Sequence, residues 1–510
     1  MAAPTSNNLI CFTNCFLPQE DGGLIEKDLW IDERRGVILD AQRTFFLRKE
    51  RPNTIIDLGG NVLSPGFIDI QINGGFGFDF SVYEGDDQTY RDGLKLVAEK
   101  IVETGVTALV PTIITQETTL YPKLLDLLRP WSPPHAAHLL GWHAEGPFLQ
   151  MSKRGAHSPA PENLADAEDW LMSGDTAPNT VGVRIITAAP EVEGVMEAIN
   201  EASKRGICFN IGHSMATTDI ATAAVRNGAR CITHLFNAMP QLHHRDPSII
   251  GLLGASPYLS PSSSSTFLPF PSAIISALNA SMHSLPITKE PSIDHISEAL
   301  DEIKTPPQTP MLLAEQALRK SLLPTGKSTE SPGSAAITAI PLGSGQSSES
   351  KLKKYFKTIP FDRPFYEIIV DGIHSHPNSV RLAYSAHPDG CILITDAMKI
   401  LDPHLKDGVH DWRDGRRFYK EGDTLYVEGT TTLAGSVVTL DKCVRNFVRY
   451  TGCSIGEAIK CATYNPARCL NIENKKGTLR AGADADLAVL DHQGNVLSTW
   501  VKGKMVWARK

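Results

Sequence analysis

The 510-residue chain lacks several features that mark common classes of protein. Its nine cysteines are scattered, odd in number and without a Cys-x-x-Cys pair, which argues against a disulfide framework and indicates a reducing compartment. No run approaches the roughly 18 consecutive apolar residues of a membrane span. The first residues, MAAPTSNNLI, resemble neither a secretion signal nor an import signal. We therefore expect a cytoplasmic protein without a membrane partner.

The chain also lacks an excess of positive charge, since its net charge is −8 and its pI is near 6.1. A chain without an overall basic field does not attract a nucleic-acid backbone, so we expect no nucleic-acid partner. An anionic ligand must instead meet a local group of Arg and His. The glycine-rich stretches NGGFGF and TTLAGS do not match the nucleotide-binding loops GxGxxG and GxxxxGKS in their strand and helix context. We interpret both stretches as turns that approach a ligand closely.

The composition is ordinary for a globular protein, with 42% hydrophobic and 21% charged residues. The length allows one large domain of about 250 residues or more together with an accessory domain. Between Gly59 and about Leu470, short apolar β-like runs alternate with helical patterns. One helical pattern, RDGLKLVAEKIVETG, ends at Gly105, a residue type that commonly caps helices. The alternation predicts an α/β fold with a parallel sheet or a (β/α)8 barrel.

The two ends of the chain follow a different pattern. Residues 8–58 and 477–510 carry short alternating strands separated by turn signals. We predict that residues 1–58 and 477–510 form one small β-sandwich domain, while residues 59–476 form the barrel. Two unrelated caps are the alternative interpretation.

One segment interrupts the barrel pattern. From about Pro257 to Lys354 the chain is rich in Ser, Pro and Thr, a composition that buries too little apolar surface to offset chain entropy. We predict a largely disordered insertion at about 258–350. Within it, residues 292–304 and 310–323 have helical apolar spacing and predict two short helices.

Six of the predicted strands end in side chains that bind metals or exchange protons. In a barrel the carboxyl ends of all strands converge on one face, so residues far apart in the chain can share a pocket. The runs and their polar residues are GFIDIQIN with Asp69, Gln71 and Asn73; HLLGWHAEGPF with His143 and Glu145; ICFNIGHS with His213; CITHLFN with His234 and Asn237; EIIVDGIH with Asp371 and His374; and CILITDA with Asp396.

Three of these residues form a metal-ligand set. Glu145, His213 and His234 supply one carboxylate and two imidazoles, which suit a catalytic zinc with one position open for water. Any one of them alone is more simply a hydrogen-bonded residue near the core, but their common predicted face favours a metal. Asp396 follows a run of apolar β-formers and can accept a proton from water and return it to a leaving amine. The alternative role of Asp396 is an N-cap for the following segment.

Three further residues are candidates for substrate contacts. His157, in KRGAH, can polarise a carbonyl group. Arg245, in HHRDP, suits bidentate capture of a phosphate or carboxylate, with solvated surface charge as the alternative. His374, at the end of a β run, is a second candidate for contact with an anion.

The chain contains, in this order, the motifs PGFIDIQINGGFGFDF, GWHAEGPFL, KRGAH, IGHSMATTD, THLFNAMPQLHHRDP, IVDGIHSHP, LITDAM, TTLAGSVVTLD and ATYNPARCL. This series resembles the N-acetylglucosamine-6-phosphate deacetylase family of the amidohydrolase superfamily. The resemblance covers nearly all of the chain outside the insertion, and THLFNAM with GHS and EGPF is far more specific than a single ligand spacing. It implies a TIM barrel with a β-sandwich, hydrolysis to glucosamine 6-phosphate and acetate in amino-sugar catabolism, and a homodimer.

The resemblance also implies a role for each site residue. Glu145, His213 and His234 would hold one divalent metal ion per subunit, expected to be Zn²⁺, which activates water. Asp396 would act as general base and then as general acid. The implied substrate contacts are His157 with the acetamide carbonyl; Asn237, the Ala238 backbone and Arg245 with the sugar phosphate; His374 with the phosphate of its own or the partner subunit's site; and Leu433, Ala434 and Gly435 with the acetamide group.

Two features depart from related patterns. Many amidohydrolases carry His-x-His at the end of the first barrel strand and bind two metals, whereas this chain has Gln71 and Asn73, whose amides are poor zinc ligands. We therefore expect one metal. The insertion falls between Arg245 and His374, where it is placed to disturb the dimer contact that positions His374.

Two other functions compete with this interpretation. Another amidohydrolase, such as a cyclic amidase or a deaminase, would share the barrel but not the phosphate contacts near Asn237 and Arg245. A non-catalytic scaffold, with the insertion as a docking segment, would have lost ligands that this chain keeps.

Overall fold

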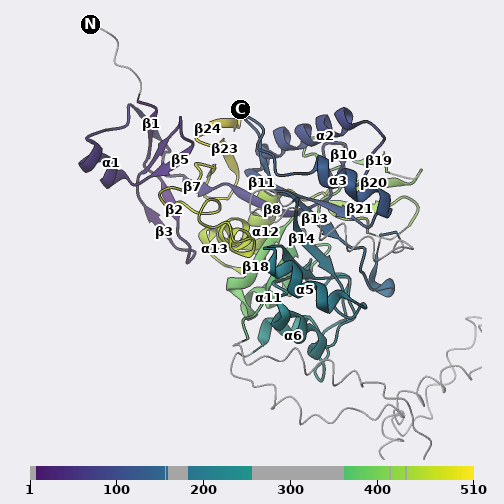
Figure 1. Cartoon of the computed structure of the whole chain (residues 1–510). Coiled ribbons are helices and arrows are strands. Elements are labelled where there is room, and N and C mark those ends of the chain that lie inside the picture. Colours follow the sequence, from purple (N-terminus) through teal and green to yellow (C-terminus); the bar gives the residue numbers. More distant parts are fainter. Residues whose placement is uncertain (1–6, 156, 159–181, 256–360, 413–414, 431–432) are drawn as a thin grey trace, which may run out of the picture. The chain divides into compact units, whose positions relative to one another are not determined.

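The computed structural model describes residues 7–155, 157–158, 182–255, 361–412, 415–430 and 433–510 (Figure 1). The insertion predicted at about 258–350, with its two predicted helices, lies outside these described residues. The described residues form a barrel of parallel strands, one sheet of amino-terminal strands, one sheet that combines strands of both ends of the chain, and smaller sheets beside the barrel. No described helix is long and apolar enough to cross a membrane.

The barrel consists of eight parallel strands in the order β8-β11-β13-β14-β15-β16-β17-β18, and β12 also pairs with β11. The backbone N–H of Asp396 donates to the carbonyl of Gln71 at 2.9 Å, which connects the last strand to the first. The strands are β8 (Phe67–Ile72), β11 (Val106–Ile114), β12 (His138–Leu139), β13 (Trp142–Glu145), β14 (Val183–Ala188), β15 (Cys208–Ile211), β16 (Cys231–Ile232), β17 (Phe365–Ile369) and β18 (Cys391–Ile394).

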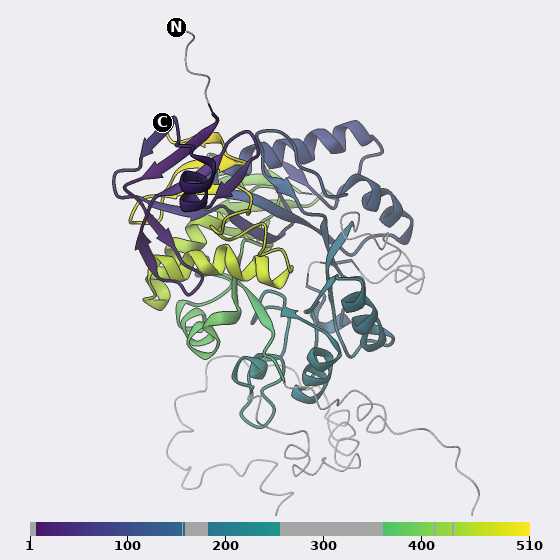
Figure 2. The same cartoon turned by 60° about the vertical axis from the view of Figure 1, so that its left-hand side comes forward.

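The strands are buried along almost their whole length, as expected when helices cover the outside of a parallel sheet and side chains fill its inside. Each of the six strand predictions coincides with one of these strands, and the predicted TIM barrel is confirmed. Helices lie around the strands in both views (Figures 1 and 2). They are α2 (Asp87–Lys100), α3 (Tyr121–Leu127), α5 (Val195–Lys204), α6 (Thr218–Asn227), α11 (Pro377–Ala386), α12 (Leu440–Thr451), α13 (Ile455–Ala462) and α14 (Tyr464–Cys469).

Local signals determine where the helices begin and end. The Asp86 side chain accepts from the Thr89 N–H and starts α2 at Asp87, earlier than the predicted helical pattern. The chain then tightens into the 3₁₀ turn η1, and Gly105 ends it with a φ of 80°. Further 3₁₀ turns are η1 (Ile101–Thr104), η2 (Thr118–Leu120), η3 (Met151–Lys153), η4 (Ile250–Gly254) and η6 (Pro388–Gly390).

Two further sheets are built from the ends of the chain, the first from amino-terminal strands alone and the second from strands of both ends. A four-stranded sheet has the order β5-β4-β1-β6, and a six-stranded sheet has the order β24-β23-β22-β7-β2-β3. These elements are β1 (Leu9–Thr13), β2 (Phe16–Pro18), β3 (Leu24–Glu26), β4 (Leu29–Asp32), β5 (Val37–Leu39), α1 (Ala41–Arg48), β6 (Thr54–Asp57), β7 (Val62–Pro65), β22 (Leu487–Leu490), β23 (Val496–Val501) and β24 (Lys504–Ala508).

One hydrophobic core joins the two ends of the chain. Phe12 packs edge-on against Trp500 with ring centroids 5.1 Å apart, and Ile31, Leu63 and Leu487 belong to the same cluster. The predicted accessory sheet domain at the termini is thus present. Its exact boundaries stay a prediction.

Two small sheets follow barrel strands at their carboxyl ends. After β8 comes the pair β9 (Gly74–Gly75) and β10 (Phe78–Asp79), and after β18 comes the antiparallel sheet β19 (Gly408–Asp411), β20 (Arg417–Glu421) and β21 (Thr424–Val427). Asp79 of β10 and Trp412, which directly follows β19, line the mouth of the barrel.

Candidate active site

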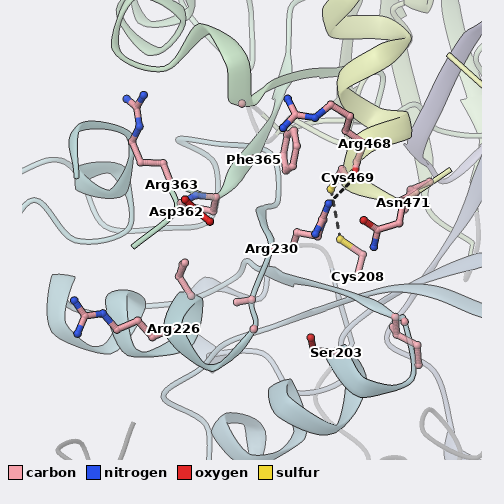
Figure 3. A pocket seen from close by; sticks show the side chains of 18 of the residues that line it. Ser203, Cys208, Arg226, Arg230, Asp362, Arg363, Phe365, Arg468, Cys469 and Asn471 are labelled. Carbon is pink, nitrogen blue, oxygen red and sulfur yellow. Dashed lines mark hydrogen bonds between the residues drawn. The ribbon is translucent and has the colours of Figure 1, made fainter. Parts of the chain in front are cut away.

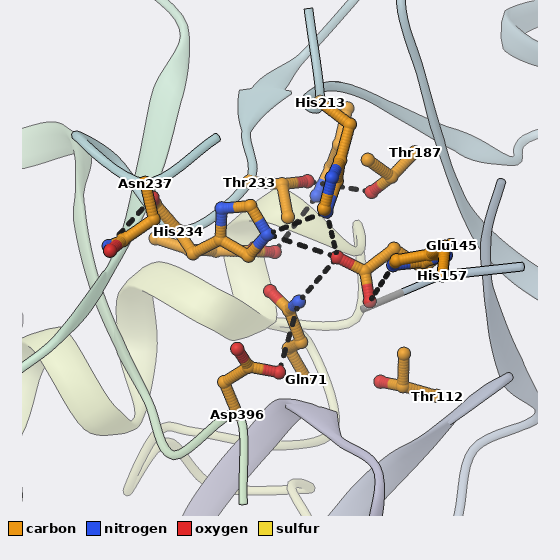
Figure 4. Close-up of polar contacts among 12 residues, drawn as sticks. Gln71, Thr112, Glu145, His157, Thr187, His213, Thr233, His234, Asn237 and Asp396 are labelled. Carbon is orange, nitrogen blue, oxygen red and sulfur yellow. Dashed lines mark hydrogen bonds and ion pairs between the residues drawn. The ribbon is translucent and has the colours of Figure 1, made fainter. Parts of the chain in front are cut away.

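The proposed metal ligands and Asp396 stand at the carboxyl ends of four barrel strands. Glu145 is the last residue of β13, while His213, His234 and Asp396 each lie two residues beyond β15, β16 and β18. The last three have φ angles of 49°, 29° and 47°. Non-glycine residues in this left-handed region cost free energy and are concentrated at functional sites. The turns direct all four side chains into the mouth of the barrel (Figure 4).

The backbone before His213 requires a residue without a side chain. A Cβ atom at Gly212 would lie 2.6 Å from Cγ2 of Thr187 and 2.8 Å from Cβ of Thr233. Those two threonines share a hydrogen bond of 2.6 Å inside the barrel, and Thr187 also contacts Nε2 of His143 at 2.6 Å. The Gly-His pair therefore lets β15 pass close to its neighbours and still present an imidazole at its end.

Three potential ligand atoms converge in this mouth. Oε1 of Glu145 lies 2.9 Å from Nε2 of His213 and 3.0 Å from Nε2 of His234, and the two Nε2 atoms are 3.0 Å apart. All three side chains are buried. Nδ1 of His213 lies 2.7 Å from the carbonyl oxygen of Lys153, which holds the ring with Nε2 toward the other two ligands. One carboxylate and two imidazoles with converging donor atoms fit a divalent metal.

The electrostatics of Glu145 agree with a ligand role. Burial acts to raise its pKa, but hydrogen bonds from His213 and His234 hold the pKa well below its ordinary value. The carboxylate is therefore kept ionised in a buried place, which is the state that a metal cation requires of it.

Asp396 is positioned by the two amides that follow the first strand. The side-chain amide of Asn73 donates to Oδ1 of Asp396 at 2.8 Å, and that of Gln71 lies 3.4 Å from the same oxygen. Gln71 also donates to Oε1 of Glu145 at 3.1 Å, so it lies between the two carboxylates (Figure 4). Burial and the nearby charge of Glu145 raise the pKa of Asp396 to about 6. A carboxyl group with such a pKa can exchange protons near neutral pH.

His157 lies beside the ligand group. Its Nδ1 accepts from the Thr115 N–H at 3.3 Å, and its Nε2 lies 3.8 Å from Oε2 of Glu145. Because Nδ1 accepts, the neutral ring carries its proton on Nε2, on the side of the cavity. His157 can therefore donate a hydrogen bond to a carbonyl oxygen bound next to Glu145.

These residues line one cavity of about 280 Å³. The sequence-predicted residues that it brings together are Glu145, His157, His213, His234, Asn237, Ala238, His374, Leu433, Ala434, Gly435 and Asp396. Arg245 is not among the lining residues; it lies exposed on the loop after Ala238, where its N–H is 3.3 Å from Nδ1 of His243.

His374 is oriented by a carboxylate of its own loop. Nδ1 of His374 lies 2.6 Å from Oδ2 of Asp371, while Oδ1 of Asp371 accepts from the backbone N–H groups of Ile373 and His374 at 2.8 Å. Nε2 is consequently the nitrogen that His374 presents to a ligand. Within a single chain, His374 lines the same cavity as Asp396.

The loop at Leu433–Gly435 lies against the turn that carries Asp396. The N–H of Met398 donates to the carbonyl of Ser436 at 3.0 Å, and Ser436 returns a bond to the carbonyl of Asp396 at 3.3 Å. Gly435 has a φ of 82°, and a Cβ atom there would lie 2.6 Å from Cγ of Met398. The loop thus forms an apolar wall, through Leu433 and Ala434, next to the acidic side chain.

Several lining residues were not predicted from the sequence. Trp412 and Met398 reach the cavity from the segment after β18, and Asp79 and Ser81 reach it from the segment after β8. Asn73 was considered only as a poor metal ligand, although its hydrogen bond to Asp396 is the feature that matters here. The position of Asn73 at a strand end, two residues from Gln71, was the available signal.

A second group of potential metal ligands surrounds the ammonium group of a lysine. His138, Asp484 and Asp486 lie close together, but Nζ of Lys476 is 2.9 Å from Nδ1 of His138, 3.0 Å from Asp484 and 2.5 Å from Asp486. The ammonium group stands where a cation would bind. This cluster connects the barrel to the terminal sheets and is structural.

Comparison with known proteins agrees with the family resemblance of the sequence motifs. The Amidohydrolase family model matches residues 326–506. The N-acetylglucosamine-6-phosphate deacetylase of Bos taurus is 35% identical over 98% of this chain and 96% of its own length. The enzyme of the same name from Homo sapiens is 35% identical over 97% of this chain and 95% of its own length.

A solved structure shows the same fold. A variant of the N-acetyl-D-glucosamine-6-phosphate deacetylase from Mycobacterium smegmatis, in complex with N-acetyl-D-glucosamine-6-phosphate, superimposes with a TM-score of 0.63 at 22% identity, covering 98% of this chain and 99% of that chain. The barrel, the converging potential ligands and the match over nearly the full length of the relatives lead to one conclusion: the chain belongs to the N-acetylglucosamine-6-phosphate deacetylase family of metal-dependent amidohydrolases.

Proposed function

We propose that this chain releases acetate from N-acetylglucosamine 6-phosphate, the compound in its family's name, at the cavity formed by Glu145, His213, His234 and Asp396. The observation that carries the proposal is that a three-atom ligand group and an acidic side chain with a raised pKa share one buried mouth. An amide hydrolysis needs this combination: an activated water and a group that moves protons.

Glu145, His213 and His234 would hold one divalent metal ion, for which Zn²⁺ suits the nitrogen and carboxylate donors. When bound, such an ion acts as a Lewis acid and lowers the pKa of water. Gln71 holds the first-strand position where many amidohydrolases carry a histidine, and its amide donates to Glu145 and Asp396. This arrangement supports a single metal.

Asp396 moves the protons of the reaction. Its carboxylate accepts a proton from the attacking water and then delivers it to the nitrogen of the leaving amine. The hydrogen bond from Asn73 fixes one carboxylate oxygen, so the other can face the substrate. His157 donates from Nε2 to the acetamide carbonyl oxygen, where negative charge develops in the transition state.

The remaining lining residues, together with the exposed loop residue Arg245, bind the sugar phosphate. The apolar wall of Leu433, Ala434 and Gly435 suits the acetyl methyl group, and Asn237 with the Ala238 backbone offers polar contacts to the sugar. Arg245 and His374 supply the cationic and donor groups for the phosphate.

A homodimer, as the family resemblance implies, provides a second chain that can cover the exposed loop of Arg245. Light scattering of the purified protein tests the dimer.

An assay of acetate release on matched substrates tests the function. The protein should act on N-acetylglucosamine 6-phosphate, act far more weakly on N-acetylglucosamine, and lose activity after chelation. Hydrolysis of a cyclic amide or a deamination at a higher kcat/KM would instead favour another amidohydrolase activity. A metal-loaded, folded protein that acts on none of these compounds would support the scaffold alternative.

A further inference from the structure

A second cavity lies at the opposite end of the barrel strands. Its volume is about 690 Å³, and it shares no lining residue with the active-site cavity. Its walls include residues at or just before the starts of β14, β15, β16, β17 and β18, among them Arg184, Cys208, Arg230 and Phe365. Since the strands are parallel, this cavity opens at the amino-terminal mouth, away from the metal ligands.

Five arginines are among the residues that line the cavity, and four of them are labelled in Figure 3. One of its two acidic residues, Asp389, is already paired with Lys460 at 2.7 Å. The chain as a whole has a net charge of −8, so this concentration of arginine is local. The charged lining residues are Arg184, Arg226, Arg230, Arg363, Arg468, Asp362 and Asp389.

Two of these arginines bind only neutral oxygens within the described part of the chain. Arg184 donates to the carbonyl of Leu470 at 3.5 Å, and Arg230 donates to the carbonyl of Arg468 at 2.6 Å. The Nε atoms of Arg184 and Arg230 are buried and have no hydrogen-bond acceptor among the described residues. Burial lowers the pKa of Arg184, so the fold disfavours its charge. Both side chains are half-buried, and a partly desolvated cation is stabilised when a ligand supplies a counter-ion.

The guanidinium groups are also held in fixed orientations. Those of Arg230 and Arg468 lie 5.7 Å and 5.3 Å from the ring centroid of Phe365, and Arg468 also lies 5.8 Å from the ring centroid of Tyr464. Arginine stacked on an aromatic ring keeps its planar fork available for bidentate contact with an oxyanion. Less side-chain entropy is then lost when an anion binds.

We propose that this amino-terminal cavity binds a small phosphate monoester, with Arg184 and Arg230 as the principal phosphate contacts and Arg468 beside them. A cavity of about 690 Å³ is far larger than a single phosphate group and falls within the range of about 300–1,000 Å³ that is typical of metabolite sites. The ligand is therefore a phosphorylated metabolite, of the size of a sugar phosphate or a nucleoside monophosphate, and not free phosphate.

A ligand in this cavity contacts the starts of strands that run toward the proposed metal ligands. β15 runs from Cys208 in the cavity wall toward His213, and β16 begins next to Arg230 and runs toward His234. A ligand that neutralises the arginines at the starts of these strands stabilises the barrel that carries the metal ligands. Binding should raise the Tm without displacing the substrate, because the two cavities are separate.

Isothermal titration and thermal unfolding of the metal-loaded protein test the site. The probes are AMP, glucose 6-phosphate and inorganic phosphate, with adenosine and glucose as uncharged controls. We expect saturable binding of at least one ester, a rise in Tm, and at least tenfold weaker binding of inorganic phosphate. The affinity for the ester should be unchanged in R245A, which alters the active-site loop.

Two variants of the cavity complete the test. R184Q/R230Q removes both contacts, and S203E places a carboxylate at the cavity wall from an exposed position on α5. Each should weaken ester binding at least tenfold, whereas R91Q/R129Q, at exposed arginines elsewhere, should not. The proposal is overturned if no ester binds, if inorganic phosphate binds equally well, or if S203E binds the ester with unchanged affinity.

Discussion

The two mouths of the barrel are built from the same strands, but their side chains suit ligands of opposite charge. At the carboxyl ends, Glu145 and Asp396 stand with imidazoles around a cavity that suits a metal cation. At the amino ends, arginines stand around a cavity that suits an anion. β16 contains two residues, so Arg230 and His234 contribute to opposite mouths from one short stretch of chain.

The backbone differs between the mouths as well. His213, His234 and Asp396 all have positive φ angles, whereas the amino-end residues Arg184 and Arg230 do not. Strained turns are expected where side chains must converge on reacting atoms. At the amino end, stacking on Phe365 orients two guanidinium groups without such turns. The comparison indicates a site built for chemistry at one end and a site built for binding at the other.

The largest effect should follow from Asp396→Asn. The amide keeps the shape of the side chain but cannot exchange a proton, so kcat should fall by about 10²–10⁴-fold. Substrate binding and metal content should stay near their original values. The matched control is Asp389→Asn at the other mouth, which should leave kcat unchanged. A D396N enzyme with a substantial fraction of the original kcat would remove Asp396 from the proposed role.

The next effect concerns the phosphate of the substrate. Arg245→Ala should raise KM for N-acetylglucosamine 6-phosphate far more than for N-acetylglucosamine, because a lost charge-assisted contact costs about 1.5–3 kcal/mol. Arg129→Ala, at an exposed arginine elsewhere, is the control. Steady-state kinetics on both sugars decide the point. Equal losses on the two sugars would make Arg245 a structural residue.

A smaller loss should follow from Asn73→Ala. Removing the amide that donates to Asp396 at 2.8 Å frees the carboxylate to rotate, and we expect kcat to fall by about tenfold, consistent with one hydrogen bond to a charged group. KM and metal content should change little. Asn495→Ala, in the terminal sheets, serves as the control. An unchanged kcat would show that Asp396 is held without Asn73.

The smallest effect is expected for the segment at about 258–350. Arg363 donates to the carbonyl of Leu253 at 2.9 Å, so the described chain on either side of the segment is already held together. β16 and β17 also pair directly. Replacing the segment with a short Gly/Ser linker should preserve folding, metal content and most of the activity, because loop-closure entropy depends weakly on length. Unfolding or metal loss would contradict this expectation.

Much of the carboxyl-end mouth could be predicted because strand direction and residue type suffice there. Glu145, His213, His234 and Asp396 follow apolar runs, and parallel strands bring their ends together. Trp412 could not be found in this way. It reaches the cavity through the excursion of β19 to β21, whose path depends on tertiary packing.

The cavity at the amino-end mouth could not be predicted from the sequence, for a related reason. Arg184, Arg230 and Arg468 lie far apart in the chain, at strand starts or on a helix, and resemble ordinary surface charges when considered one at a time. Only the closed barrel places them around one cavity. Asn73 was recognised at a strand end, but its role depends on a partner that lies 323 positions later in the chain.

Titration of the chelator-treated protein with Zn²⁺, while acetate release from N-acetylglucosamine 6-phosphate is followed, tests the central claim most directly. We expect no activity without metal and a linear rise that stops at about one equivalent per chain, because the amides of Gln71 and Asn73, which donate to Glu145 and Asp396, are poor zinc ligands. A plateau at two equivalents, or full acetate release without metal, would contradict it.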